Sequence, residues 1–254
     1  MIKTRIKAVY FSPTSTTEKI VKELVQAIPN STVEYDNVTM LQERSKTPEK
    51  CNHDLVVVAS PVYSSLAPKL FIDYLEKLKG EGTKIVILAV YGNRSAGETC
   101  RQISELTTKN GFKTIAAAAF IGEHSFSDDN YEIAPGRPDA DDLSLARVFG
   151  VKLSTLLTKD AIGIDPEELG NPPGECNDII FTPPTVSDSC DDCGKCTDVC
   201  PVGIIATGGT DCIGCGACVR ICNLKSRVFP EKINQYQIKL STNCKARLEP
   251  KIYL

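Results

Sequence analysis

The chain has no long hydrophobic run. Its longest apolar stretches, DLVVVASPVY (54–63) and TIAAAAFIG (114–122), fall well below the roughly 20 residues of a membrane-spanning helix. The segment MIKTRIKAVYF lacks an apolar core followed by a small-residue cleavage site, so no secretory signal is expected. A formal net charge of -3 and the lack of a basic tail argue against nucleic-acid partners. We therefore expect a cytoplasmic protein without a membrane span.

Two familiar nucleotide-binding motifs are also missing. The loop SPTSTT (12–17) follows an apolar strand, but it contains neither the lysine nor the glycines of a Walker loop. The chain also has no additional strand–helix unit with a G-x-G-x-x-G motif, the mark of a dinucleotide-binding domain. This argues against a self-contained NAD(P)H reductase.

Up to residue 159, strand-like and helix-like patterns alternate along the chain. We expect strands over 6–11, 32–38, 54–60, 84–92 and 113–122. We expect helices over 16–28, 68–79, 97–111 and 139–159. The segment QERSKTPEK (42–50), between the second and third strands, is short and polar and gives no clear helix signal. This alternation predicts an α/β fold in which helices cover both faces of a five-stranded parallel sheet.

The composition changes after this region. Residues 161–184 are rich in proline and glycine and predict a stiff, irregular connector. Beyond it, CDDCGKCTDVC (190–200) recurs as CIGCGACVRIC (212–222). The predicted organisation is a first domain over 1–160, a connector over 161–184 and a small metal-stapled domain with a C-terminal tail over 185–254.

The cysteine repeat carries the most specific signal. Eight of the twelve cysteines lie in it, and the first run has the pattern C-x2-C-x2-C-x3-C-P. Three cysteines at this spacing can bind one four-iron cluster, while the fourth binds the other cluster of a pair. Structural zinc usually takes paired ligands and would leave the third cysteine of each run without a role. A disulfide scaffold would need an oxidising compartment, for which the sequence gives no sign.

This repeat resembles bacterial-type ferredoxins. The resemblance implies two 4Fe–4S clusters in a small α+β domain. It assigns one cluster to Cys190, Cys193, Cys196 and Cys222. It assigns the other to Cys212, Cys215, Cys218 and Cys200. The remaining cysteines, Cys51, Cys100, Cys176 and Cys244, are interpreted as small hydrophobic residues, with a redox role as the alternative.

Three loops of the first domain can form a ligand site. They follow the first, third and fourth strands and cover 12–17, 60–68 and 91–97. Ligands bind such sheets beyond the carboxyl ends of the strands. Hydroxyls at a helix N-terminus can hold an anion, and Tyr63 and Tyr91 can pack against a planar ring. Ser15 and Glu18 also fit a capping box, and both tyrosines can equally be core or rim residues.

The loop set resembles that of flavodoxins, and nearly the whole chain resembles fused flavodoxin-like/ferredoxin proteins, which occur mainly in anaerobes. This resemblance implies a doubly wound sheet of order 2-1-3-4-5 and one FMN. The implied FMN-binding residues are Ser12, Thr14, Ser15, Thr16, Thr17, Ser60, Pro61, Val62, Tyr63, Ser64, Tyr91, Gly92, Asn93 and Arg94.

Residues 122–143 form a loop too long for a simple connection. It is interpreted either as the strand-five insertion that long-chain flavodoxins have or as a cover near the flavin or the clusters. Its His124 and Arg137 can contact a substrate or have structural roles.

The expected function is electron transfer between FMN, two 4Fe–4S clusters and redox partner proteins. An acidic segment with Asp188, Asp191, Asp192 and Asp198 can steer a basic partner or be merely a solvated surface. An FMN-dependent reductase of a small molecule, supplied with electrons by the clusters, is the main alternative. A redox-sensing binding module is a weaker one, because no segment suggests a partner specific for one oxidation state.

Overall fold

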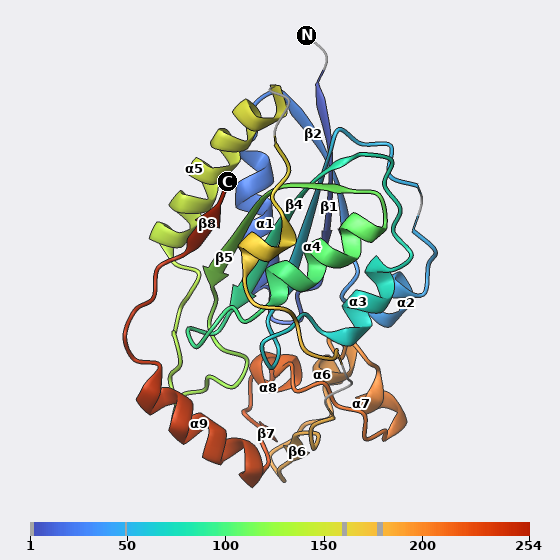
Figure 1. Cartoon of the computed structure of the whole chain (residues 1–254). Helices are drawn as coiled ribbons and strands as arrows, with labels where there is room; N and C mark the ends of the chain where they lie inside the picture. The colour runs from blue at the N-terminus through green and yellow to red at the C-terminus, as the bar shows by residue number, and fades with distance from the viewer. Residues whose placement is uncertain (1–2, 49, 159–161, 177–179) are drawn as a thin grey trace.

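A six-stranded sheet forms the centre of the computed structural model, which describes residues 3–48, 50–158, 162–176 and 180–254. The strand order is β2-β1-β3-β4-β5-β8 (Figure 1). The strands are β1 (Thr4–Tyr10), β2 (Ser31–Asn37), β3 (Leu55–Pro61), β4 (Lys84–Tyr91), β5 (Lys113–Ile121) and β8 (Lys251–Tyr253). The first five are parallel, so the predicted order 2-1-3-4-5 is confirmed.

The sixth strand corrects the expectation of a five-stranded sheet. Strand β8 comes from the C-terminal tail and pairs antiparallel with the edge of β5. It has only three residues, too few for a periodic pattern to stand out in the sequence. Its pairing covers an edge that would otherwise expose unpaired backbone groups.

Helices pack on both faces of the sheet, as predicted. Helices α1 (Thr16–Gln26) and α5 (Ala140–Thr158) share one apolar cluster with the sheet. Helices α3 (Lys69–Leu75) and α4 (Thr99–Lys109) bury side chains in the cluster on the other face (Figure 1). Between β2 and β3 the chain forms a one-turn helix, α2 (Leu41–Arg44), which the short polar pattern did not predict.

The hydrophobic patterns explain this core. All seven residues of β3 are buried, as expected for a strand covered on both faces. Edge strand β2 instead alternates between half-buried and exposed residues. On α1, Ile20, Val21 and Leu24 occupy one helical face and are buried. A Cβ atom on Gly150 would lie 2.1 Å from the Leu24 carbonyl oxygen, so this glycine permits the close packing of α5 on α1.

The cysteine repeat lies beyond the carboxyl ends of the sheet strands (Figure 1). It contains the short helices α6 (Lys195–Asp198), α7 (Ile204–Thr207) and α8 (Ala217–Ile221). The antiparallel strands β6 (Thr185–Val186) and β7 (Arg227–Val228) pair the segments just before and just after the repeat. Helix α9 (Glu231–Asn243) follows. A 3-10 turn, η1 (Pro166–Leu169), lies in the connector. The predicted domain boundary at residues 160 and 161 lies outside the described residues.

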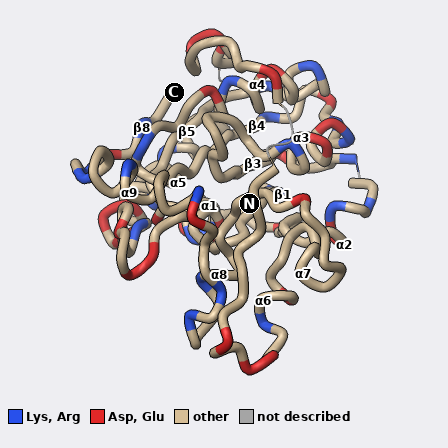
Figure 2. Tube along the Cα trace, turned by 90° about the horizontal axis from the view of Figure 1, so that it is seen from below, with Lys and Arg blue, Asp and Glu red and all other residues tan. Residues whose placement is uncertain are grey.

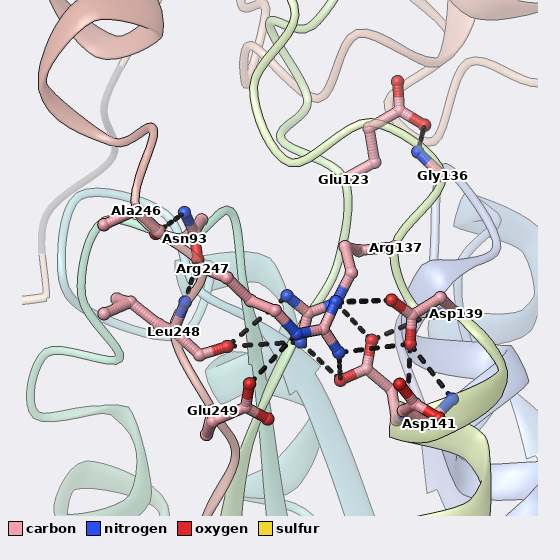
Figure 3. A network of polar contacts seen from close by, with 11 residues as sticks. Asn93, Glu123, Gly136, Arg137, Asp139, Asp141, Ala246, Arg247, Leu248 and Glu249 are labelled. Carbon is pink, nitrogen blue, oxygen red and sulfur yellow. Dashed lines mark hydrogen bonds and ion pairs between the residues drawn. The ribbon is translucent and has the colours of Figure 1, made fainter.

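A polar network holds the 122–143 loop against the C-terminal tail (Figure 3). Arg137 forms a buried ion pair with Asp142 and also donates to the Leu248 carbonyl oxygen. Arg247 in the tail pairs with Asp139, with 2.6 Å between nitrogen and oxygen. Arg137 therefore has a structural role here, one of the two roles left open for it by the sequence.

No helix in the described parts of the chain is both long enough and apolar enough to span a membrane.

Candidate functional site

The loop between β1 and α1 is built around two serines with different roles. Ser15 is the N-cap residue of α1, with a φ of 63°, and its side chain makes no capping hydrogen bond. The Glu18 backbone N–H instead donates to Ser12 Oγ at 3.0 Å. The Glu18 carboxylate accepts from the Tyr10 hydroxyl rather than reaching back to Ser15. The capping box that Ser15 and Glu18 suggested is therefore not formed.

Thr17 is the strongest indication of an anion site in this loop. The residue is only 1% exposed, and its Oγ1 has no hydrogen-bond partner among the described residues. A buried hydroxyl without a partner costs free energy, so such a group is normally satisfied. Thr16 and Ser12 are buried beside it, while Thr14 is half-buried and Ser15 exposed. The helix N-terminus and the free hydroxyl together fit an anionic group such as a phosphate.

A cavity of about 300 Å³ lies beyond the ends of β3, β4 and β5. Four of the predicted cofactor residues line it, namely Val62, Tyr63, Ser64 and Arg94. His124 and Phe126 of the 122–143 loop form another part of the wall. The cysteine repeat contributes Ile213 and Gly214. The cavity therefore lies where the first domain meets the repeat, which is a frequent location for ligand sites.

Tyr63 connects this cavity to the cysteines. Burial raises the pKa of Tyr63 well above its ordinary value, and the neighbouring thiols of Cys215 and Cys212 raise it further. Its phenol therefore stays protonated at neutral pH. Tyr63 and Ile213, which precedes Gly214 in the repeat, both pack against the apolar cluster on the α3 and α4 face of the sheet. One aromatic side chain thus contacts the cavity and lies close to two predicted cluster ligands.

Other predicted cofactor residues lie elsewhere. Ser60 and Pro61 are buried within β3, and the Ser60 hydroxyl donates to the Pro61 carbonyl oxygen. Tyr91 is buried in the core, which agrees with the core-packing alternative. A Cβ atom on Gly92 would lie 2.3 Å from the His124 ring, so that position is filled by histidine. Among the described residues, the lining of the cavity does not include Ser60, Pro61, Tyr91 or Gly92.

Asn93 is engaged by the C-terminal tail (Figure 3). Its Nδ2 donates to the carbonyl oxygens of Cys244 and Ala246 at 2.7 and 2.8 Å, and its Oδ1 accepts from the Leu248 N–H. Donor and acceptor are both occupied, so we leave Asn93 out of the proposed flavin site.

His124 is held as a neutral imidazole. Its Nδ1 accepts from the Phe126 N–H at 3.0 Å. Burial, followed by the nearby cations of Arg94 and Arg220, lowers its pKa to about 4. His124 therefore faces the cavity without a charge at neutral pH.

Four cysteines of the repeat form a buried group. These are Cys200, Cys212, Cys215 and Cys218, each less than one-tenth exposed. Burial raises the pKa values of Cys212, Cys215 and Cys218, and the other thiols of the group raise them further. Cys200 thus lies in one buried cluster with Cys212 of the second run. The Gly214 N–H donates to Cys212 Sγ at 3.4 Å, a contact that would stabilise a bound thiolate.

The other four predicted ligands lie closer to solvent. Cys190 and Cys193 are exposed, and Cys196 and Cys222 are half-buried. Pairing of β6 with β7 brings the first run toward Cys222, since the Ser187 N–H donates to the Ser226 carbonyl oxygen and the Cys190 N–H to that of Ser187. The Ser226 N–H donates to Cys222 Sγ at 3.2 Å. Backbone amides, first that of Arg227, lower the pKa of Cys222.

The donor set fits iron–sulfur ligation in its chemistry. It provides eight thiols, amide donors to sulfur and apolar walls that include Ile204 and Phe181. Across the described residues, no three histidine, cysteine, aspartate or glutamate side chains are arranged to hold a single metal ion. The ligand assignment therefore depends on the grouping of the cysteines and on their amide donors.

Contacts missed by the sequence analysis join the two parts of the molecule. Arg44 of α2 donates to the Pro201 carbonyl oxygen at 2.6 Å. Arg220 of α8 pairs with Glu123 and donates to the His124 carbonyl oxygen. The Phe126 ring packs edge-on against Phe181. These residues are far apart in the sequence, and no local motif marks them.

Three of the scattered cysteines lie in or against apolar clusters. Cys51 and Cys100 are buried in the core, and burial raises their pKa values to about 11 and 12. Burial likewise raises the pKa of Cys244. These three behave as small hydrophobic residues.

Comparisons with protein families matched the two cysteine runs. Residues 183–206 and 210–225 each match a family described as a 4Fe–4S binding domain. A comparison with curated proteins gave no match.

Several solved structures resemble part of the chain. A flavodoxin from the domain Archaea is 16% identical, with 61% of this chain and 99% of that chain covered and a TM-score of 0.44. A flavodoxin from Streptococcus pneumoniae TIGR4 is 16% identical, with 57% of this chain and 94% of that chain covered and a TM-score of 0.41. Rubredoxin oxygen:oxidoreductase from Desulfovibrio gigas is 17% identical, with 62% of this chain and 37% of that chain covered and a TM-score of 0.44.

The fold and the repeat now define the class of protein. The sheet has the strand order of flavodoxin-like proteins, and both cysteine runs lie in 4Fe–4S binding domain matches. This combination points to electron transfer. More particularly, the chain combines an α/β sheet of flavodoxin-like strand order with two matches to a 4Fe–4S binding domain.

Proposed function

We propose that the protein relays electrons between one FMN, two 4Fe–4S clusters and a redox partner. FMN would exchange one or two electrons, and each cluster would exchange one. We assign residues 1–160 to the flavin domain, 161–184 to the connector and 185–254 to the ferredoxin-type region with its tail.

The proposed flavin site combines the cavity and the hydroxyl loop. Val62, Tyr63, Ser64 and Arg94 would contact the ring, because they line one cavity. Thr17 would hold the phosphate, together with backbone N–H groups at the start of α1, because its buried hydroxyl lacks a partner. The 122–143 loop approaches both parts of the proposed site, since a Cβ atom on Gly122 would lie 3.0 Å from Thr16 Cβ and the same loop continues to His124 in the cavity wall.

The position of Tyr63 carries the proposed order of the relay. It lines the cavity together with Ile213 and Gly214, which lie between Cys212 and Cys215 in the sequence. The buried cluster would therefore be the neighbour of the flavin. The cluster held by Cys190, Cys193, Cys196 and Cys222 would be the terminal one, because two of its ligands are exposed.

The partner would approach the exposed cluster. Acidic segments lie on the loop before α6 (Figure 2), where Asp188, Asp191 and Asp192 are exposed. Such a surface favours a partner with basic residues around its own redox centre, chiefly by raising the association rate at low salt.

Anaerobic purification followed by iron, sulfide and flavin assays tests the proposal. We expect about eight iron and eight sulfide ions per chain, as two four-iron clusters require, and one FMN. Zinc in place of iron would contradict the cluster assignment, and failure to bind FMN after reconstitution would contradict the flavin assignment.

Removal of the exposed cluster tests the relay order. The variant Cys190→Ser should keep flavin reduction by the buried cluster but slow electron exchange with an added protein partner. The variant Cys215→Ser should instead uncouple the flavin. The reverse pattern would show that the order is wrong.

A further inference from the structure

Arg44 is a buried cation whose hydrogen-bond partners in the described part of the chain are all uncharged. It ends α2 and is only 7% exposed. One terminal nitrogen donates to the Val38 and Thr39 carbonyl oxygens, and the other donates to the Pro201 carbonyl oxygen at 2.6 Å. Its guanidinium carbon lies 5.5 Å from the centre of the Phe11 ring. Carbonyl dipoles and an aromatic face orient this charge but do not neutralise it.

No carboxylate in the described part of the chain forms an ion pair with Arg44. Its charge is nevertheless retained at neutral pH, because burial lowers its pKa only to about 10. A buried charge without a counter-ion is costly, and proteins normally pair it or bind an anion next to it. Among the described residues, the contacts of Arg44 therefore include no negative charge.

The cysteine repeat can provide that charge. Pro201 directly follows Cys200, which lies in the buried group with Cys212, Cys215 and Cys218. Four thiolates around a 4Fe–4S core leave the assembly with a net negative charge, which becomes larger on reduction. A cluster held next to Pro201 would balance the charge of Arg44 without an acidic side chain.

We propose that Arg44 is the buried counter-charge of the cluster held by Cys200, Cys212, Cys215 and Cys218, and that it raises the reduction potential of that cluster. This inference rests on the cluster assignment in the proposed function. A fixed positive charge stabilises the reduced, more negative state more than the oxidised state, and low solvent access reduces screening of this effect.

The same arginine also connects the cluster run to the hydroxyl loop. Thr39, whose carbonyl oxygen accepts from Arg44, also accepts the Ser12 N–H through its hydroxyl at 2.8 Å. A flavin phosphate in that loop is therefore the rival anion for Arg44. If Arg44 balances the cluster, removal of its charge should lower the reduction potential of the buried cluster. If Arg44 balances the flavin phosphate, removal of its charge should weaken FMN binding instead.

The test compares three variants by redox titration of the reconstituted protein, with each cluster followed by its paramagnetic signal. Arg44→Met removes the charge and keeps an extended apolar side chain, and Arg44→Lys keeps the charge. Lys46→Met is the matched control, because Lys46 lies two positions away, is exposed and pairs only with Glu43 among the described residues.

We expect the midpoint potential of the buried cluster to fall in Arg44→Met, to stay near the wild-type value in Arg44→Lys and to be unchanged in Lys46→Met. The potential of the exposed cluster and the FMN dissociation constant should not change. An unchanged buried-cluster potential in an Arg44→Met protein with full iron content would overturn the inference. So would a fall in FMN affinity as the only effect, which would assign Arg44 to the flavin phosphate.

Arg44→Lys decides the case in which Arg44→Met assembles no buried cluster. The inference then requires Arg44→Lys to restore the iron content, and failure of the charge-retaining variant would overturn it. Absence of iron from the wild-type protein would instead contradict the proposed function, so the two failures are distinguishable.

Discussion

At the scale of single residues, Thr17 is the most informative position of the proposed flavin site. Its hydroxyl is buried at the start of α1 and lacks a partner among the described residues. The sequence singled out the hydroxyl-rich loop, but five similar hydroxyls could not be told apart by pattern. Burial and hydrogen bonding in the folded chain distinguish Thr17 from the exposed Ser15.

We expect Thr17→Val to weaken FMN binding about tenfold, because a hydrogen bond to a charged group contributes about 1.5 kcal/mol or more. The FMN-free protein should lose no thermal stability, since valine removes a hydroxyl that had no partner. Fluorescence titration with FMN and thermal unfolding measure the two effects.

Thr107→Val is the control for this prediction. The Thr107 hydroxyl is also buried, but it donates to the Ile103 carbonyl oxygen at 2.8 Å. This variant should therefore lose stability and keep its FMN affinity. Equal FMN affinity in wild type and Thr17→Val would remove Thr17 from the site.

His124 makes stability depend on pH. Burial lowers its pKa from 6.5 to about 4 in the folded chain. Between these values the unfolded chain binds a proton that the folded chain does not, so stability falls as the pH decreases through this window. His124→Asn should reduce the loss of thermal stability between pH 7 and pH 5 relative to wild type. An equal loss in both proteins would contradict the protonation argument.

At the scale of elements, the long periodic segments were predictable and the short ones were not. Helix α1 and the five parallel strands follow their apolar periodicity. Helix α2 has a single turn and no hydrophobic face, yet it positions Arg44 against Pro201. Strand β8 is equally short, and its pairing with β5 depends on a contact between distant parts of the chain.

Two glycines at equivalent positions of the repeat test how it meets the first domain. Gly194 and Gly216 both precede a short helix, with φ values of 76° and 70°. A Cβ atom on Gly216 would lie 2.2 Å from the Ser125 carbonyl oxygen, whereas a Cβ atom on Gly194 meets nothing within 4 Å. Alanine at either position carries a backbone penalty of about 1 kcal/mol. Only at position 216 would its Cβ atom also collide with the 122–143 loop.

Gly216→Ala should therefore lose the iron of the buried cluster and make the 122–143 loop more sensitive to proteolysis. Gly194→Ala should keep nearly all of its iron and its resistance to protease. Iron assays and limited proteolysis of both proteins provide the comparison. The same losses in both variants would mean that backbone conformation alone matters, and the close contact with Ser125 does not.

At the scale of the whole molecule, the cysteine repeat lies beyond the carboxyl ends of the parallel strands (Figure 1). The sequence predicted both parts, because each has its own local pattern. It could not predict their junction, because the Phe126–Phe181 contact and the Arg44–Pro201 hydrogen bond join residues far apart in the chain. The junction is also what brings Tyr63 close to Cys212 and Cys215.

The central claim is that the flavin and the clusters exchange electrons within one chain. The most direct test is flash reduction of the reconstituted protein under anaerobic conditions, followed by the flavin absorbance at several protein concentrations. We expect a first-order flavin signal whose rate does not depend on protein concentration. A rate that increases in proportion to concentration, or no electron transfer to the flavin, would contradict the account.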